Sequence, residues 1–347
     1  MKILKKILSI TIISILLLHS IKITADASPD ISADTPIKVA VFLNAFNDQF
    51  ISNVKKNLED IQKENENKVQ FTFFDGKGNQ AVQNENIDQS LNKDFNLFVL
   101  NPVSTNLDTI EGILNKIQQK NIPLILYYAQ TTPIVNFLKS YPNSVIIDTD
   151  INQSGILQGK ILADTWNSNK EALDKNKDNI MQYIMLKGPA NSPETLARTK
   201  YSVQTINESG IKTQELLSVT CNWEEECAEN ALQSNLLSLG NKIEAVIANN
   251  DAMAIGAIKS LQKYGYNKGD NSKYIPVVGV DALPEAIELI KQGAMTGTVI
   301  QDSNDHANAI YTIGKNLVSD TPPLNGTNYK FDETGIVVKL PYYEYSK

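Results

Sequence analysis

Short apolar segments that alternate with amphipathic ones constrain the fold more than any other feature of this sequence. The apolar segments of the first series lie at residues 39–43, 69–74, 97–100 and 123–127. The stretches between them carry apolar residues at helical spacing, as in Phe50, Val54 and Leu58. Strands rich in Val, Ile and Leu with helices between them are typical of a parallel sheet covered on both faces.

A second series of the same kind begins at residues 145–147. Its further apolar segments lie at residues 182–186, 215–219, 245–247 and 276–280, and helical spacing is clearest at 151–168 and 252–265. An apolar segment at 297–300, a helical stretch from about 303 to 319 and a last apolar segment at 336–340 follow. Two such series in a chain of 347 residues predict two doubly wound α/β domains with parallel sheets.

The first 27 residues have the pattern of an export signal. Lys2, Lys5 and Lys6 precede an apolar run from Ile7 to Leu18, and small residues at 25–27 suit cleavage after Ala27. The alternative is an uncleaved anchor, for which the apolar run is short. Residues 28–36 are polar and predict a flexible leader. We therefore expect a protein exported to the periplasm or the outer face of the cytoplasmic membrane.

The cysteines and the charge exclude several classes of protein. No cysteine lies in residues 1–27, which excludes lipid attachment through an N-terminal cysteine. Four lysines and one aspartate give that segment a charge of +3, so the rest of the chain carries −10 of the total of −7. Such an acidic surface repels phosphate backbones, and nucleic acid is not an expected partner.

Beyond the export signal the chain has one histidine, His306, and two cysteines, Cys221 and Cys227. A catalytic triad, a metal-hydrolase site of several imidazoles or a zinc cluster therefore lacks parts. In an exported protein the two cysteines are expected to form a disulfide around a short loop. Two free buried thiols are the alternative.

Polar side chains follow the ends of the predicted strands, which is where ligands bind in open α/β sheets. They are mainly Asp, Asn and Gln, joined by one arginine, Arg198, and two aromatic rings, Phe50 and Trp223. Planar polar groups can hydrogen-bond adjacent hydroxyls in pairs, and aromatic rings can cover the apolar faces of a pyranose. No glycine-rich phosphate loop occurs in the chain. The pattern favours a neutral polyol over a nucleotide.

Helix capping is the alternative interpretation of the same residues, because Asp and Asn are common where a strand turns into a helix. In Asn249-Asn250-Asp251, which precedes a helix expected near Ala252, we predict Asp251 as the cap.

The sequence resembles the sugar-binding receptors of ATP-driven importers, and among them the periplasmic glucose/galactose-binding receptors. The resemblance covers about residues 37 to 345, and Ala248–Met253 and Gly279–Ala286 are its most specific stretches. It implies a type I periplasmic binding protein fold with two lobes and a multi-strand hinge. The implied N-terminal lobe is 37–147 plus about 301–331. The implied C-terminal lobe is 148–300 plus about 332–347.

The resemblance also implies ten sugar-contacting positions. They are Asp48, Phe50, Asn101, Ser192, Glu194, Arg198, Trp223, Asn250, Asp281 and Gln301. Three of them differ in identity from the family's residues: Ser192 replaces a histidine, Glu194 an aspartate and Gln301 an asparagine. A single mismatched methylene or unpaired hydroxyl changes selectivity by about 10- to 200-fold, so the resemblance does not fix the sugar.

Residues 174–182 have the spacing of a calcium-binding loop. Asp174, Asn176, Asp178 and Gln182 occupy positions 1, 3, 5 and 9, and Ile180 at position 7 can offer its carbonyl. Position 6 is normally glycine, and Asn179 is the next most tolerant residue of positive φ. Position 12 is Met185, which cannot ligate, so a distant carboxylate must complete the site.

The resemblance supplies that carboxylate, because the family's remote glutamate falls on Glu244. The sequence then predicts a structural Ca²⁺ site with no position left for substrate. A solvated polar loop, with Asp and Asn present for turn formation, is the alternative.

Two functions fit this sequence. The first is a monomeric, non-catalytic receptor that delivers a glucose- or galactose-like monosaccharide to a membrane permease of the ATP-driven class. The second is a membrane-anchored sensor that reports sugar occupancy to a kinase or chemoreceptor. A sugar-processing enzyme is disfavoured by the resemblance to a non-catalytic family. A transcription regulator of related fold would need an N-terminal helix-turn-helix, which an export signal replaces here.

Overall fold

The computed structural model describes residues 35–347. The predicted export signal and most of the leader lie outside the described residues. Within them no helix is long and apolar enough to cross a membrane.

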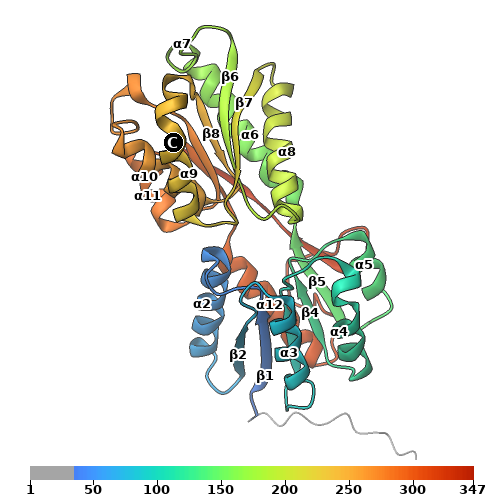
Figure 1. Cartoon of the computed structure of the whole chain (residues 1–347). Helices are drawn as coiled ribbons and strands as arrows, with labels where there is room; N and C mark the ends of the chain where they lie inside the picture. The colour runs from blue at the N-terminus through green and yellow to red at the C-terminus, as the bar shows by residue number, and fades with distance from the viewer. Residues whose placement is uncertain (1–34) are drawn as a thin grey trace, which may run out of the picture. The chain divides into compact units, whose positions relative to one another are not determined.

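The first half of the chain and one strand from near its C-terminus form a six-stranded sheet in the order β11-β5-β4-β3-β1-β2 (Figure 1). All of its strand pairs are parallel. The strands are β1 (Ile37–Leu43), β2 (Val69–Asp75), β3 (Leu97–Leu100), β4 (Leu124–Tyr127), β5 (Ser144–Thr149) and β11 (Val337–Leu340).

Helices cover both faces of this sheet. One face packs against α2 (Gln49–Glu64) and α12 (Ser303–Val318), and the other against α3 (Gln80–Ser90), α4 (Leu107–Gln119) and α5 (Thr132–Leu138). Alternate strand residues serve the two faces: Val41 belongs to the core under α2, and Phe42 to the core under α4. A sheet buried on both faces needs apolar residues at every strand position, which explains the continuous apolar segments of the sequence.

The second sheet has the order β12-β10-β9-β8-β6-β7. Its strands are β6 (Ile180–Lys187), β7 (Lys212–Thr220), β8 (Ala245–Ala248), β9 (Val277–Asp281), β10 (Gly297–Ile300) and β12 (Tyr343–Ser346). The last of these is antiparallel to β10. One face packs against α9 (Glu225–Leu239), α10 (Asp251–Lys263) and α11 (Pro284–Gln292), the other against α6 (Ile151–Ser168), α7 (Lys170–Leu173) and α8 (Pro193–Glu208).

The two-lobed, doubly wound α/β fold predicted from the sequence is confirmed. Three connections join the lobes: β5 to α6, β10 to α12, and β11 to β12.

The assignment of all residues after about 332 to the C-terminal lobe is wrong for β11. Val337 to Leu340 pair in parallel with Ile146 to Thr149 of β5, so this strand completes the sheet of the N-terminal lobe. Only β12, three residues further on, belongs to the second sheet. The apolar pattern of residues 336–340 indicates a buried strand, but it carries no information on which sheet accepts it.

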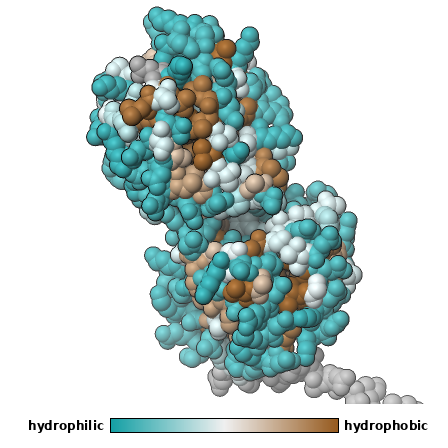
Figure 2. Space-filling view, in the orientation of Figure 1, coloured by the Kyte–Doolittle hydropathy of each residue, from teal (hydrophilic) through white to brown (hydrophobic). Residues whose placement is uncertain are grey.

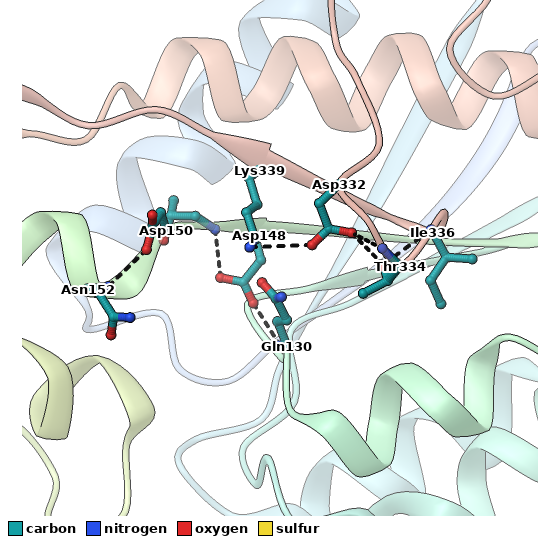
Figure 3. Close-up of polar contacts among 9 residues, drawn as sticks. Gln130, Asp148, Asp150, Asn152, Asp332, Thr334, Ile336 and Lys339 are labelled. Carbon is teal, nitrogen blue, oxygen red and sulfur yellow. Dashed lines mark hydrogen bonds and ion pairs between the residues drawn. The ribbon is translucent and has the colours of Figure 1, made fainter.

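Polar residues cluster where β5 and β11 leave the first sheet (Figure 3). The Asp148 carboxylate accepts hydrogen bonds from the backbone N–H groups of Gln130 and Thr149, and burial raises its pKa to about 7. Lys339, paired with Asp148 in register, forms an ion pair with Asp332 at 3.4 Å. Asp150 then caps α6 through the N–H of Asn152. Carboxylates thus hold the backbone of this crossing in place.

Candidate functional site

A cavity of about 640 Å³ collects residues from the strand ends of both sheets. All ten predicted sugar-contacting residues line it: Asp48, Phe50, Asn101, Ser192, Glu194, Arg198, Trp223, Asn250, Asp281 and Gln301. Its size lies in the usual range for small-molecule sites. On the face shown in Figure 2 hydrophilic residues predominate, with short hydrophobic patches on each lobe.

The topology explains why residues so far apart in sequence meet. In each sheet the strand order reverses beside one central strand, β1 in the first and β6 in the second. Helices on opposite faces diverge there and leave a crevice at the carboxyl ends of the strands. Asp48 and Asn101 follow β1 and β3 at the first crevice, and Asn250 follows β8 at the second.

Three of the ten predicted lining residues cap helices as well. Asp48 accepts the N–H of Ile51 at 2.9 Å, Ser192 that of Thr195 at 3.2 Å, and Asn250 that of Met253 at 3.0 Å. Capping and lining the cavity are therefore compatible, because a cap holds the side chain at the crevice through one of its lone pairs.

Our prediction of Asp251 as the cap of α10 is wrong: Asn250 fills that position. Asp251 is the first residue of the helix and is fully buried. Its carboxylate accepts hydrogen bonds from the Leu283 N–H at 2.9 Å and the Thr298 hydroxyl at 2.7 Å. Burial raises its pKa to about 6. These two hydrogen bonds connect α10 to the segment after β9 and to β10, close in sequence to Asp281 and Gln301.

Arg198 is the centre of the polar network in the second lobe. Its guanidinium donates to the Asn249 carbonyl at 2.7 Å and to Gln301 Oε1 at 3.0 Å. A longer bond of 3.3 Å reaches the Tyr342 hydroxyl, in the connection between β11 and β12. The side chain is 4% exposed, and its Nε has no hydrogen-bond partner among the described residues.

Burial raises the pKa of two carboxyl groups that line the cavity. The pKa of Asp281 lies well above its ordinary value, mainly because the group is buried, although Arg198 opposes the shift. Burial likewise raises the pKa of Asp48, against the hydrogen bonds that it accepts from α2. A ligand with hydroxyl donors would compensate such carboxylates.

Each lobe contributes one predicted aromatic ring to the cavity. Phe50 of α2 is 7% exposed and packs edge-on against Tyr128 and His306. Trp223, half-buried, follows β7, and the Arg198 guanidinium lies 5.6 Å from its ring centre.

The sequence interpretation missed Tyr128, which lines the cavity directly after β4. Its ring stacks on His306 with an interplanar angle of 5°, and the His306 Nδ1 lies 2.9 Å from the Tyr127 hydroxyl. Burial lowers the pKa of His306 to about 3, so this imidazole stays neutral. The strand-end rule could have found Tyr128, because this residue follows the apolar segment 123–127.

The structure joins Cys221 and Cys227 in a disulfide, as expected. It links the end of β7 to the first turn of α9, and Trp223 lies inside the loop that it closes.

The loop at 174–182 folds as a series of tight turns. Asp174 accepts the backbone N–H groups of Asp178 and Asn179, and Asn176 accepts that of Asp178. Asn179 has a φ of 61°, as expected for the position normally held by glycine. The amide of Gln182 donates to Asp178, while Gln182 Oε1 is buried without a hydrogen-bond partner among the described residues.

Glu244 lies beside this loop, as the resemblance implies. It is 1% exposed and accepts the backbone N–H groups of Lys175 and Gln182 at 2.7 and 3.1 Å. Within residues 35–347 no three His, Cys, Asp or Glu side chains converge closely enough to hold a metal ion by themselves. A cation at this loop would therefore also need the amide oxygens of Asn176 and Gln182 and a backbone carbonyl.

Comparison with known proteins decides the family. The profile of the "Periplasmic binding protein domain" family matches residues 39–322. The chain belongs to the periplasmic binding protein family. The D-galactose/methyl-galactoside binding periplasmic protein MglB of Haemophilus influenzae is 32% identical over 317 residues, 91% of each chain.

Solved structures share the fold at lower identity. A solute binding protein of an ABC transporter from Bacillus halodurans, with bound myo-inositol, superposes with a TM-score of 0.71 at 22% identity over 91% of this chain and 96% of its own. A similar protein from Actinobacillus succinogenes, with bound D-allose, gives 0.70 at 19% identity over 89% and 97%. The family match and the 32% identical relative, which is named as a binding protein, support the expectation of a non-catalytic binding receptor.

Proposed function

We propose that the protein binds a glucose- or galactose-like monosaccharide in the cavity and delivers it to an ATP-driven sugar importer. The main support for this proposal is that all ten predicted sugar-contacting residues line one cavity. They combine carboxylates, carboxamides and one guanidinium with an aromatic ring from each lobe. A pyranose presents hydroxyls around its edge and apolar C–H groups on its faces, and this set of side chains complements both.

The charge state of the cavity suits a neutral ligand with several hydroxyl donors. Arg198 brings one permanent positive charge, and Asp48, Glu194 and Asp281 bring three carboxyl groups. Sugar hydroxyls would donate to these carboxyl groups, and a hydroxyl oxygen would accept from Arg198 Nε, which has no hydrogen-bond partner within residues 35–347. The relative that is 32% identical is named for D-galactose and methyl-galactosides, which supports a hexose.

The three departures from the family pattern all line the cavity. The Ser192 hydroxyl donates to Glu194, and Gln301 accepts from Arg198. A serine is shorter than the imidazole that it replaces, whereas Glu194 and Gln301 each add a methylene. We expect these residues to set which hydroxyl configurations the receptor accepts.

Calorimetry with glucose, galactose, xylose, arabinose and ribose tests the proposal. At least one hexose should bind with a 1:1 stoichiometry, and it should raise the melting temperature because it binds only the folded state. A preference for a pentose would revise the substrate class. No binding of any sugar in this set would contradict the proposal.

We propose a membrane permease as the partner of a monomeric receptor. The sensor alternative depends on residues 1–27 remaining as an anchor, and that segment lies outside the described residues. Mass determination of the exported protein distinguishes the two: cleavage after Ala27 favours transport, and an intact N-terminus favours a sensor that acts on a kinase or chemoreceptor.

We propose further that the 174–182 loop and Glu244 hold a structural Ca²⁺. The ligands would be Asp174, Asn176, Asp178, Ile180 through its carbonyl, Gln182 and Glu244. The supporting observations are the buried, unpartnered Gln182 Oε1 and the buried Glu244 carboxylate beside a loop with an oxygen-rich donor set. A bound cation would stabilise the second lobe and take no part in sugar binding.

A further inference from the structure

The backbone that presents Trp223 to the cavity has an unfavourable conformation. Asn222 and Trp223 are consecutive residues with φ of 52° and 71°. Asparagine tolerates the left-handed region, but a bulky aromatic residue there is an outlier. Such conformations persist only where surrounding contacts impose them. The contacts of this loop therefore decide where the Trp223 ring lies.

Packing of Trp223 and Cys227 against the core and the Lys259–Glu225 ion pair at 2.6 Å help to hold the loop. The Cys221 N–H donates to the Lys187 carbonyl at 2.7 Å, and the Glu224 N–H donates to the Cys221 carbonyl at 2.9 Å. The Trp223 carbonyl accepts from Asn250 Nδ2 at 3.2 Å. Glu224 stands at the N-cap of α9 but makes no capping hydrogen bond with its side chain. The disulfide adds a covalent constraint: it ties the residue before the strained pair to Cys227, with the two Cα atoms 5.3 Å apart.

The Trp223 ring lies in a slot with little free space. A Cβ added to Gly188 would be 2.3 Å from two atoms of the ring, so only glycine permits this approach. The Arg198 guanidinium lies over the same ring. Because the slot is tight, a small shift of the loop would move the ring away from Gly188 and change the wall that it presents to the cavity.

We propose that the Cys221–Cys227 disulfide is a positioning element for Trp223, and that ligand affinity depends on its oxidation. This inference rests on the proposed sugar-binding function of the cavity. With the disulfide intact, the loop keeps its left-handed pair and the ring faces the ligand. With two thiols, the pair relaxes and the ring leaves its slot. Cys227 is half-buried, at the accessible end of the bond.

A double-mutant cycle separates positioning from general stability. Replacing both cysteines (Cys221→Ser with Cys227→Ser) should raise the Kd of the best-binding sugar by about fivefold to tenfold. In the Trp223→Ala background the same replacement should change the Kd by less than about twofold, because the positioned ring is already absent. A merely structural role of the disulfide would lower affinity equally in both backgrounds and would overturn the proposal.

Leu236→Ala is the matched control for stability. Leu236 lies on α9, as Cys227 does, and is buried in the core away from the cavity. Its replacement should lower the melting temperature while leaving the Kd within about twofold. A loss of affinity equal to that of the cysteine variant would overturn the proposal.

Reduction of the wild-type protein gives a second readout that needs no variant. Dithiothreitol transfers two electrons and two protons to the disulfide, which becomes two thiols, and is itself oxidised to its cyclic disulfide. Acrylamide quenching of tryptophan fluorescence should then increase. Trp166, the only other tryptophan, is 1% exposed and contributes a constant background. Unchanged quenching and unchanged Kd on complete reduction would overturn the proposal.

The two proposals fail in different ways. If the oxidised protein binds no sugar, the proposed function fails, yet increased quenching on reduction would still support the positioning of Trp223. If the oxidised and reduced proteins bind sugar equally well, the proposed function stands and this inference fails.

Discussion

The two lobes have the same strand order but hold their parts of the cavity by different means. The first lobe uses neutral packing, in which Phe50, Tyr128 and His306 form an aromatic cluster beneath the strand ends. The second lobe uses charge and a covalent link: Arg198 organises the polar groups, and the disulfide closes the loop that carries Trp223. The candidate Ca²⁺ loop also belongs to the second lobe.

This difference shows that equivalent positions of a repeated fold can be stabilised by unrelated interactions. The first lobe buries one carboxyl group near its aromatic cluster, Asp148, and presents a second, Asp48, to the cavity. The second lobe buries Asp251, Asp281 and Arg198. Buried charges need partners in defined geometry, so the second lobe should be more sensitive to single substitutions.

The largest effect is expected from Arg198→Met. The substitution leaves Gln301 Oε1 and the Asn249 carbonyl without their donor, and Asp281 without the positive charge that opposes its raised pKa. Breaking a buried charge network costs about 3–5 kcal/mol. Urea unfolding should show this loss, and sugar binding should become undetectable by calorimetry.

Lys200→Met, an exposed position on the same helix, is the control and should stay within about 0.5 kcal/mol of wild type. An Arg198→Met protein as stable as this control would contradict the importance of charge in the second lobe.

Removal of Ca²⁺ should have the next largest effect. A ligand present at 100 times its Kd stabilises the folded state by about 2.7 kcal/mol, so chelation with EGTA should lower the melting temperature by several degrees. Added Ca²⁺ should restore it, and Asp178→Ala should remove the response. The exposed Asp164→Ala serves as control. A melting temperature indifferent to EGTA would show that the loop is a solvated turn.

Comparison of Trp223→Ala with Phe50→Leu tests the contrast between the aromatic rings of the lobes. Trp223→Ala should weaken sugar binding by about 2 kcal/mol, roughly 30-fold, with little loss of stability because the ring is half-buried. Phe50→Leu should lower both affinity and stability, since Phe50 also packs on His306. Calorimetry and thermal melting measure the two effects, and unchanged affinity of Trp223→Ala would contradict the stacking hypothesis.

The smallest effect is expected from a change of one pH unit, through the buried His306. Its pKa in the folded protein is about 3, below the 6.5 of an exposed imidazole. As the pH falls from about 6.5 toward 3, the unfolded chain binds a proton that the folded protein does not. The imidazole therefore lowers stability by up to about 1.4 kcal/mol per pH unit in this range.

Urea unfolding of wild type and His306→Gln between pH 4 and 7 isolates this contribution. Asp148, with its pKa raised to about 7, acts in the opposite direction but does so in both proteins. The difference in unfolding free energy between the two should shrink on acidification. A constant difference would mean that His306 has the same pKa in the folded and the unfolded protein.

The site was more predictable than a sequence usually allows, and the reason is geometric. In a parallel α/β sheet all carboxyl ends of the strands lie at one edge, so reading the residues after each apolar segment finds the crevice. Tyr128 also obeys this rule, because it directly follows β4. The rule does not predict which hydroxyl each residue would bind. That depends on contacts between the lining residues, such as those of Ser192 with Glu194 and of Gln301 with Arg198.

The sequence by itself predicted the elements from local periodicity and Asn179 from the spacing of its loop. It predicted the disulfide from the expected export, and the ten cavity residues from the family resemblance. Only the tertiary structure determines that β11 joins the sheet of the first lobe and that Asn250, not Asp251, caps α10. The same holds for the hydrogen bonds from Arg198 to Asn249, Gln301 and Tyr342. Those outcomes depend on pairing and burial between residues distant in the chain. An apolar segment specifies that a strand will be buried, but its neighbours in the folded protein specify where.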